Sequence, residues 1–440
     1  MNLIPRVIHR RIAHRPNLVK IVDNIGWLFF DKILRMGVGL FVGVWIARYL
    51  GPEQLGLLGF ATAFVGLFGP IATLGLQGIV VRDIVRNPSG KEETLGTAAA
   101  LHVVGGLIAY ALILASIFWL RPDDSLVKVM VGILGSMMLF QASQVAVYWF
   151  ESQVISKYTV WVQSGVFLVF AAVKVVLIWN EEPLVAFVWA MLVEAVFVAL
   201  ALLGVLGLRG PALTRLSASV HRAKSLLLDS WPLILSAAAI MVYMKIDQVM
   251  LGQMVGSREV GFYSAAVNLV NPLFAIANMI VASLFPAIVS MIDDSMVLRS
   301  RLLKLYSFVF WSAVCLALPT IFLAEWIIVI LYGSEYYKAS EVLAIYVLSL
   351  PFAFWGMASS RWYVAKGLQV KLFQRAFMGA VVNVALNYVF INAFGLIGAA
   401  YATLISYALV GLIFDLHSKN TKDQFSIKIS SVNPLRLKIS

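Results

Sequence analysis

Apolar runs long enough to cross a membrane recur from one end of the chain to the other, separated by short polar turns. A helix rises about 1.5 Å per residue, so about 20 apolar residues span the ~30 Å hydrocarbon core of a bilayer. The pattern therefore predicts an all-α integral membrane protein. We expect about twelve transmembrane helices, at residues 26–49, 57–80, 96–120, 127–150, 158–179, 184–207, 231–252, 261–290, 303–331, 341–365, 373–393 and 395–416.

The composition excludes a water-soluble enzyme. Apolar residues make up 61% of the chain and charged residues 13%, with a mean hydropathy of +0.90, whereas soluble proteins are about half apolar and about a quarter charged. The single cysteine, Cys315, excludes an intramolecular disulfide. The sequence contains neither a GxxxxGK[ST] phosphate loop nor an HExxH motif. We therefore expect no metal site and no ATP hydrolysis, and we expect that the protein is not an enzyme.

The positions of the basic residues give the topology. With the N-terminus in the cytoplasm, the inward segments hold 24 lysines and arginines and the outward loops hold three. The positive-inside rule then predicts that both termini are cytoplasmic. The net charge of +12 is explained by contact with anionic membrane lipids, and no nucleic acid is needed. Residues 1–25 form a basic arm without the apolar core of a signal peptide, and residues 417–440 form a basic tail.

The chain divides near its midpoint. The longest inward connection, 208–230, contains the basic, partly amphipathic stretch LTRLSASVHRAKSLLL, which is typical of a helix on the membrane surface. It separates an N-terminal six-helix bundle at 26–207 from a C-terminal six-helix bundle at 231–416. Six is an even number of crossings, so both halves enter the membrane from the same side. The halves are therefore expected to be parallel repeats around a central cavity, as in transporters.

Two glycine hairpins support this repeat. Gly51 and Gly56 bracket the first outward turn, and Gly256 and Gly261 bracket the corresponding turn of the second half, at an offset of 205 residues. Because glycine has no Cβ, these positions allow helices to approach closely, and we expect them to form the outer gate. The alternative is that they only satisfy the dihedral angles of the turns.

Three stretches resemble the Wzx-type polysaccharide and O-antigen flippases of the multidrug/oligosaccharidyl-lipid/polysaccharide exporter superfamily. They are DQVMLG at 247–252 with EVGFYSAA at 259–266, LYGSEYYKASEVLAI at 331–345, and NVALNYVFINAFGLIGAAYATLISY at 383–407. The resemblance implies that an undecaprenyl-diphosphate-linked oligosaccharide moves to the outer leaflet of a bacterial inner membrane, for O-antigen, capsule or exopolysaccharide synthesis. The resemblance also implies that the polysaccharide polymerase and the chain-length machinery are candidate partners.

Such a substrate requires a water-filled cavity with some positive charge. Charged residues of the first span are the candidates to line it. Arg35 lies roughly 14 Å into that span, and ionisable residues at this depth usually face a bundle interior. Asp31, Lys32 and Arg35 are spaced to share one helix face. We expect Lys32 and Arg35 to contact the diphosphate, with Asp31 holding Arg35. The alternative is that the cluster extends to the interface as membrane anchors.

Further charges lie in later spans. Lys245 and Asp247 are two residues apart and therefore on different faces; one lines the cavity and the other pairs with a neighbouring helix. Glu194 is the candidate for proton or sodium coupling, and a structural partner for a buried base is the alternative. Lys174 and Arg48 stand beside aromatic residues near span ends and are expected to be anchors.

Two asparagine pairs lie near mid-membrane. Asn268 and Asn271 are three residues apart, and Asn383 and Asn387 are four residues apart. Both pairs suit sugar hydroxyls in the cavity, but asparagines also serve as hydrogen bonds between packed helices.

Two other functions remain open. A multidrug exporter of the same superfamily has the same fold, but Arg35 and Lys245 would repel cationic drugs. A membrane polysaccharide polymerase would need charged residues on a large outward loop, and the outward loops are short.

Overall fold

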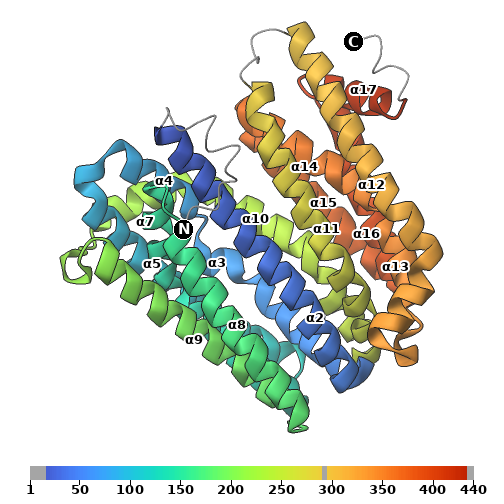
Figure 1. Cartoon of the computed structure of the whole chain (residues 1–440). Helices are drawn as coiled ribbons and strands as arrows, with labels where there is room; N and C mark the ends of the chain where they lie inside the picture. Colours follow the sequence, from blue (N-terminus) through green and yellow to red (C-terminus); the bar gives the residue numbers. More distant parts are fainter. Residues whose placement is uncertain (1–15, 290–294, 434–440) are drawn as a thin grey trace. The chain divides into compact units, whose positions relative to one another are not determined.

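The computed structural model describes residues 16–289 and 295–433, and every regular element within them is a helix (Figure 1). A backbone in hydrocarbon must satisfy its own N–H and C=O groups, which a helix does within one segment. Parts of the basic arm and tail expected from the sequence, at 1–15 and 434–440, lie outside the described residues.

The chain forms two compact units. The first contains the residues up to Tyr49 and Phe64–Ala238, and the second contains Leu50–Ala63 and the residues from Ala239 onward. Helix α2 and helix α10 each contribute to both units.

The elements in chain order are α2 (Pro16–Leu67), α3 (Gly69–Thr73), α4 (Gln77–Arg86), η1 (Pro88–Gly90), α5 (Lys91–Leu120), α6 (Ser125–Gly135), η2 (Ser136–Ser143), α7 (Gln144–Ser152), α8 (Lys157–Trp179), α9 (Leu184–Arg209), η3 (Leu213–Arg215), α10 (Val220–Met254), α11 (Ser257–Val289), α12 (Ser295–Tyr332), η4 (Ser334–Tyr336), α13 (Ala339–Val347), α14 (Leu350–Ala365), α15 (Gln369–Phe394), α16 (Leu396–Gly411), η5 (Ile413–His417) and α17 (Lys422–Ser431).

The expected all-helical membrane fold with about twelve crossings is confirmed. Nine helices of the described chain are long and apolar enough to span a membrane, and the bent pair α13 and α14 adds a tenth. The membrane-spanning part of helix α2, Val19–Leu67, is 49 residues long, which exceeds twice the length of one crossing, and it kinks at Gly51 with φ 70°. Counting α2 twice and adding the shorter apolar α16 gives twelve crossings.

Several expected spans are not single helices. The span at 341–365 is the bent pair α13 and α14, and the span at 395–416 ends in the 3₁₀ segment η5. The span at 57–80 ends as a helix at Leu67, continues as α3, and breaks at Leu74 and Gly75, which have φ of 50° and 59°. The cause is local, because Pro70 lacks a backbone N–H and Gly75 adopts the left-handed conformation without a Cβ penalty. The span at 127–150 passes through the eight-residue 3₁₀ segment η2 at its centre.

The second half of the expected surface linker is helical and continuous with the seventh span, because α10 begins at Val220. Its first turns are fixed to the first unit by charge pairs. Arg222 donates to Asp83 at 2.9 Å, and Arg82 lies 2.5 Å from Asp229. Hydrogen bonds to these two acids, that to Asp229 foremost, raise the pKa of Arg82. Residues 220–238 are therefore part of the first unit.

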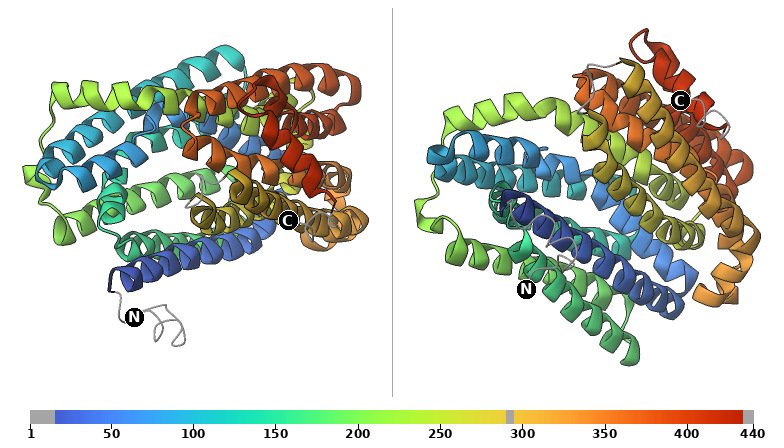
Figure 2. Two further views of the ribbon diagram at one scale, coloured as in Figure 1. Left: turned by 90° about the horizontal axis from the view of Figure 1, so that it is seen from above. Right: turned by 45° about the horizontal axis from the view of Figure 1, so that its top comes forward.

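In the second unit the long helix α12 packs against α13, α14 and α17 (Figure 2). At its centre the rings of Phe310 and Trp355 stack with centroids 4.7 Å apart. The indole N–H of Trp355 donates to the backbone oxygen of Tyr306 at 3.1 Å. This satisfied aromatic core fixes α14 on α12.

Candidate functional site

The charged cluster of the first span is assembled partly as expected. Asp31 accepts a hydrogen bond of 2.5 Å from the hydroxyl of Ser164 on α8. The Nε atom of Arg35 lies 3.8 Å from the same carboxylate, and its guanidinium stands 5.6 Å from the centre of the Phe167 ring. Arg35 is thus held in place while 35% of its side chain stays accessible. Lys32 is exposed and forms no ion pair or hydrogen bond with residues 16–289 or 295–433.

Asp247 is the centre of a buried polar cluster in the second unit. It lies on α10 and accepts hydrogen bonds from Tyr263 on α11 at 2.6 Å, Thr403 on α16 at 2.6 Å and Asn387 on α15 at 2.8 Å. The Nδ2 group of Asn387 also donates to the side-chain oxygen of Asn383 at 3.1 Å. All five side chains are buried. Four helices therefore meet around one carboxylate.

This cluster has an unbalanced charge. None of the four neighbours of Asp247 in the cluster is basic, and within the described chain no ion pair reaches its carboxylate. Asn387 Oδ1 and Asn383 Nδ2 are buried and have no hydrogen-bond partner among the described residues. An isolated buried carboxylate is costly and is normally neutralised. Carboxylate, amide and hydroxyl oxygens are the ligands of hard cations, so these residues fit either a bound proton or a small monovalent cation.

The other candidates of the second half are not hydrogen-bonded into this cluster. Lys245 is half-buried, and Asn268 and Asn271 are exposed and half-buried. None of the three forms a hydrogen bond or ion pair with any described residue. The structure therefore brings Asp247 together with the asparagines of α15, and not with those of α11.

Glu194 pairs with a base that the sequence does not suggest. Its Oε2 atom accepts a hydrogen bond of 2.7 Å from the ammonium of Lys174, across α8 and α9. The expectation that Lys174 is an interfacial anchor is wrong, because its charge turns toward Glu194. Both side chains border a cavity of about 330 Å³ in the first unit.

The hairpin glycines serve two different purposes. Gly51 and Gly256 have φ of 70° and 145°, which other residues rarely adopt. Gly56 and Gly261 instead sit at a close approach: a Cβ at Gly56 would overlap the backbone oxygen of Ser257, and one at Gly261 would overlap that of Pro52. Within the second unit, residues 50–63 and the start of α11 thus pack backbone against backbone.

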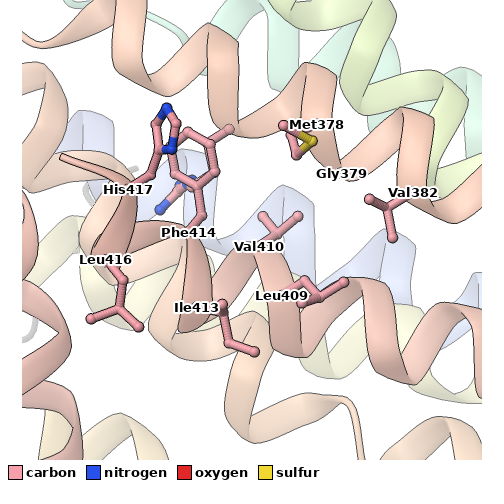
Figure 3. Close-up of a pocket in the computed structure, with 10 residues that line it drawn as sticks. Met378, Gly379, Val382, Leu409, Val410, Ile413, Phe414, Leu416 and His417 are labelled. Atoms are coloured by element: carbon pink, nitrogen blue, oxygen red, sulfur yellow. The ribbon is translucent and has the colours of Figure 1, made fainter.

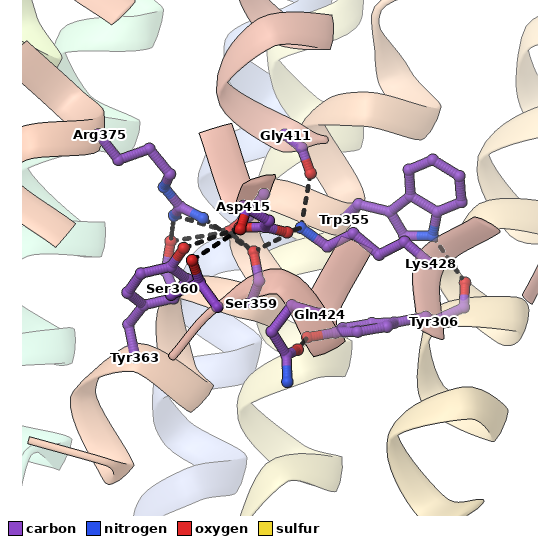
Figure 4. A network of polar contacts seen from close by, with 12 residues as sticks. Tyr306, Trp355, Ser359, Ser360, Tyr363, Arg375, Gly411, Asp415, Gln424 and Lys428 are labelled. Atoms are coloured by element: carbon purple, nitrogen blue, oxygen red, sulfur yellow. Dashed lines mark hydrogen bonds and ion pairs between the residues drawn. The ribbon is translucent and has the colours of Figure 1, made fainter. Parts of the chain in front are cut away.

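A further polar network, at the end of the second unit that contains α17, was not recognised in the sequence (Figure 4). Lys428 is fully buried and donates to Asp415 at 2.6 Å and to the backbone oxygen of Gly411 at 2.6 Å. Arg375 donates to Ser359 at 2.8 Å beside them. Burial lowers the pKa of Lys428 to about 8, against the opposing effect of Asp415. The signal was an acid, Asp415, near the end of the last apolar run.

An apolar groove of about 430 Å³ lies between α15 and the end of α16 (Figure 3). Arg375 and His417 are its basic lining residues, and the rest of its wall is apolar.

Residues 21–292, more than half of the chain, match the family model described as polysaccharide biosynthesis protein. The chain belongs to this family. Among curated proteins, no sequence matches the chain.

Solved structures share the fold of this family member along nearly its whole length. The lipid II flippase MurJ, in an inward closed conformation, superposes with a TM-score of 0.73 at 17% identity, over 94% of this chain and 91% of that one. An inward-facing MATE family multidrug resistance transporter of the MOP superfamily gives 0.70 at 16% identity, over 91% and 96%. A MOP superfamily transporter from Pyrococcus furiosus gives 0.62 at 16% identity, over 93% and 96%. The chain therefore has the MOP-superfamily transporter fold.

Proposed function

We propose that the protein is a flippase that moves a polyprenyl-diphosphate-linked oligosaccharide from the cytoplasmic to the outer leaflet of a bacterial inner membrane. The membership of residues 21–292 in the polysaccharide biosynthesis protein family carries this proposal. The lipid II flippase among the structures with this fold supports it. The substrate belongs to O-antigen, capsule or exopolysaccharide synthesis, and both termini of the chain face the cytoplasm. The protein moves its substrate without acting as an enzyme.

Arg35 is the residue that distinguishes this substrate from a cationic drug. A guanidinium at mid-span, held by Asp31 and by the ring of Phe167, attracts a diphosphate and repels a cation. Its accessible fraction of 35% leaves donors available to a ligand. Lys32 adds a second positive charge on the same helix. In the second unit, Lys245 is a further base, and Asn268 and Asn271 are candidate partners for the hydroxyls of other sugar units of the oligosaccharide.

The Asp247 cluster provides the coupling to an ion. A carboxylate surrounded only by neutral donors binds a proton or a sodium ion, and the bound cation changes the charge of the joint between four helices. A cation that binds one conformation of the transporter more tightly than the other shifts the equilibrium toward that conformation. Glu194, already neutralised by Lys174, is less suited to this role.

The test is complementation of a strain that lacks the gene. We expect Arg35→Ala to abolish surface polysaccharide at unchanged protein level, and Arg35→Lys to retain part of it because the charge remains. Arg48→Ala is the matched control, since it removes an arginine of the same helix near the end of the span, and it should retain polysaccharide. Normal polysaccharide in Arg35→Ala would contradict the proposal. Restored export of ethidium with no effect on polysaccharide would indicate a multidrug exporter.

A further inference from the structure

The fourth span opens a polar pocket inside the first unit. Between α6 and α7 the backbone runs as the 3₁₀ segment η2 for eight residues, whereas such segments rarely exceed three or four. This segment faces α8 and α9 across a cavity of about 330 Å³. The cavity is lined by Gln141, Ser143 and Gln144 from the fourth span, and by the Lys174–Glu194 pair.

The two glutamine side chains in this pocket contribute no hydrogen bonds to the described fold. In a 3₁₀ register residues three apart eclipse each other, which places Gln141 and Gln144 on the same side. Neither side chain forms a hydrogen bond with any part of the described chain. By contrast, the hydroxyl of Ser143 is satisfied by the backbone oxygen of Phe140 at 2.9 Å. Uncompensated polar groups are expensive at membrane depth, so two free amides that line one cavity indicate a ligand.

The charges in the pocket restrict the ligand to a neutral one. The ion pair of 2.7 Å uses one oxygen of Glu194 and one N–H of Lys174, and it leaves an acceptor and two donors. Glu194 repels a phosphate and Lys174 repels a cation. Amide, carboxylate and ammonium groups together offer both donors and acceptors, which is what a hydroxyl group requires on its partners.

The apolar part of the cavity wall and the volume of the cavity further restrict the class of ligand. Phe140 and methionine side chains also line the cavity, and they offer an apolar surface to the C–H face of a sugar ring. At the ~30 Å³ that a water occupies in the liquid, the cavity of about 330 Å³ corresponds to roughly eleven waters, which is enough room for one pyranose ring with its hydroxyls and a few waters around it.

We propose that this pocket binds one neutral monosaccharide unit of the transported lipid-linked saccharide, through Gln141, Gln144, Lys174 and Glu194. This inference rests on the proposed function and adds the place where the sugar is recognised. It separates sugar recognition in this pocket from recognition of the diphosphate at Arg35.

The experiment measures binding to the full-length protein in lipid nanodiscs, which contain no sugar-based detergent. The probes are short-chain polyprenyl diphosphates that carry a single glucose, galactose or N-acetylglucosamine, and the same diphosphate without a sugar. We expect the wild type to bind at least one sugar-bearing probe about tenfold more tightly than the bare diphosphate, since a few net hydrogen bonds supply that difference.

Gln141→Ala combined with Gln144→Ala should remove this preference while leaving affinity for the bare diphosphate unchanged. Gln153→Ala, which removes an amide at the end of the same span that donates to Ser152, should retain the preference. If the double variant does not elute as a monodisperse peak, the single Gln144→Ala variant replaces it. A purely structural pocket would change stability without changing sugar preference.

The outcomes separate the two proposals. A preference that persists in the pocket variants would overturn the sugar site and leave the flippase function standing. Equal binding of all four probes by the wild type would also overturn the sugar site. Binding of none of the probes by the wild type would overturn the sugar site and count against the proposed function as well.

Discussion

Replacing Asp247 by asparagine is expected to abolish ion coupling while leaving the fold intact. The carboxylate accepts three hydrogen bonds, from Tyr263, Thr403 and Asn387, at 2.6 to 2.8 Å. Asparagine has the same shape but one acceptor oxygen, so about one donor loses its partner and the others lose their charge-assisted strength. We expect a cost of about 2–3 kcal/mol in the free energy of unfolding.

The cation dependence of stability measures the coupling directly. A ligand that binds only the folded state at a hundredfold its Kd adds about 2.7 kcal/mol. For the wild type we therefore expect Tm to rise when sodium chloride replaces choline chloride at constant ionic strength, or when the pH falls in the absence of sodium. In Asp247→Asn both responses should disappear, because the charge that binds the cation is gone.

Asn392→Ala is the control for this measurement. Asn392 lies on the same helix as Asn387, is exposed, and donates only to the backbone oxygen of Tyr388 among the hydrogen bonds of the described chain, so its loss should leave the cation response unchanged. If Asp247→Asn kept both the Tm response and full polysaccharide export, the assignment of Asp247 as the coupling group would be refuted.

Three further predictions concern the hairpin glycines, Lys428 and the topology. Gly56→Leu with Gly261→Leu should force the backbones of the two hairpins apart and slow export in protein that still reaches the membrane; unchanged cross-linking between cysteines at positions 54 and 259 would exclude a gating role. Lys428→Ala leaves a buried carboxylate unpaired, at a cost of about 3–5 kcal/mol, and should expose α17 to protease. In the wild type burial lowers the pKa of Lys428 from 10.5 to about 8, so the folded state binds fewer protons in that window and stability should rise with pH through it; the rise should be absent from Lys428→Ala. Ser217→Cys in a Cys315→Ala background should be labelled only from the cytoplasm, and labelling from outside would contradict the topology.

The apolar pattern by itself determined the class of fold. Because a backbone in hydrocarbon has no water to bond to, a run of about 20 apolar residues crosses the membrane mainly as helix. The crossings could therefore be counted before any contact was known. Spacing along one helix was also readable, and Asp31 and Arg35, four residues apart, do interact.

The positions of the helix breaks are harder to predict from the sequence. The expected span at 57–80 consists of apolar residues throughout most of its length, but Pro70 and Gly75 divide it. The 3₁₀ segment η2 carries no comparable signal in its sequence SMMLFQAS. Its geometry depends on the helices that pack against it, and the polar pocket beside it depends on the same packing.

Partners from distant parts of the chain were decided only by the tertiary structure. Asp247 meets Asn387 and Thr403 across 140 and 156 residues, and Lys428 meets Asp415 through the return of α17. The sequence marks such a residue as costly inside a membrane but gives no rule for its partner. That choice is made where helices with no local relation come into contact, because a buried charge is stabilised by whichever groups the packing brings within hydrogen-bond distance.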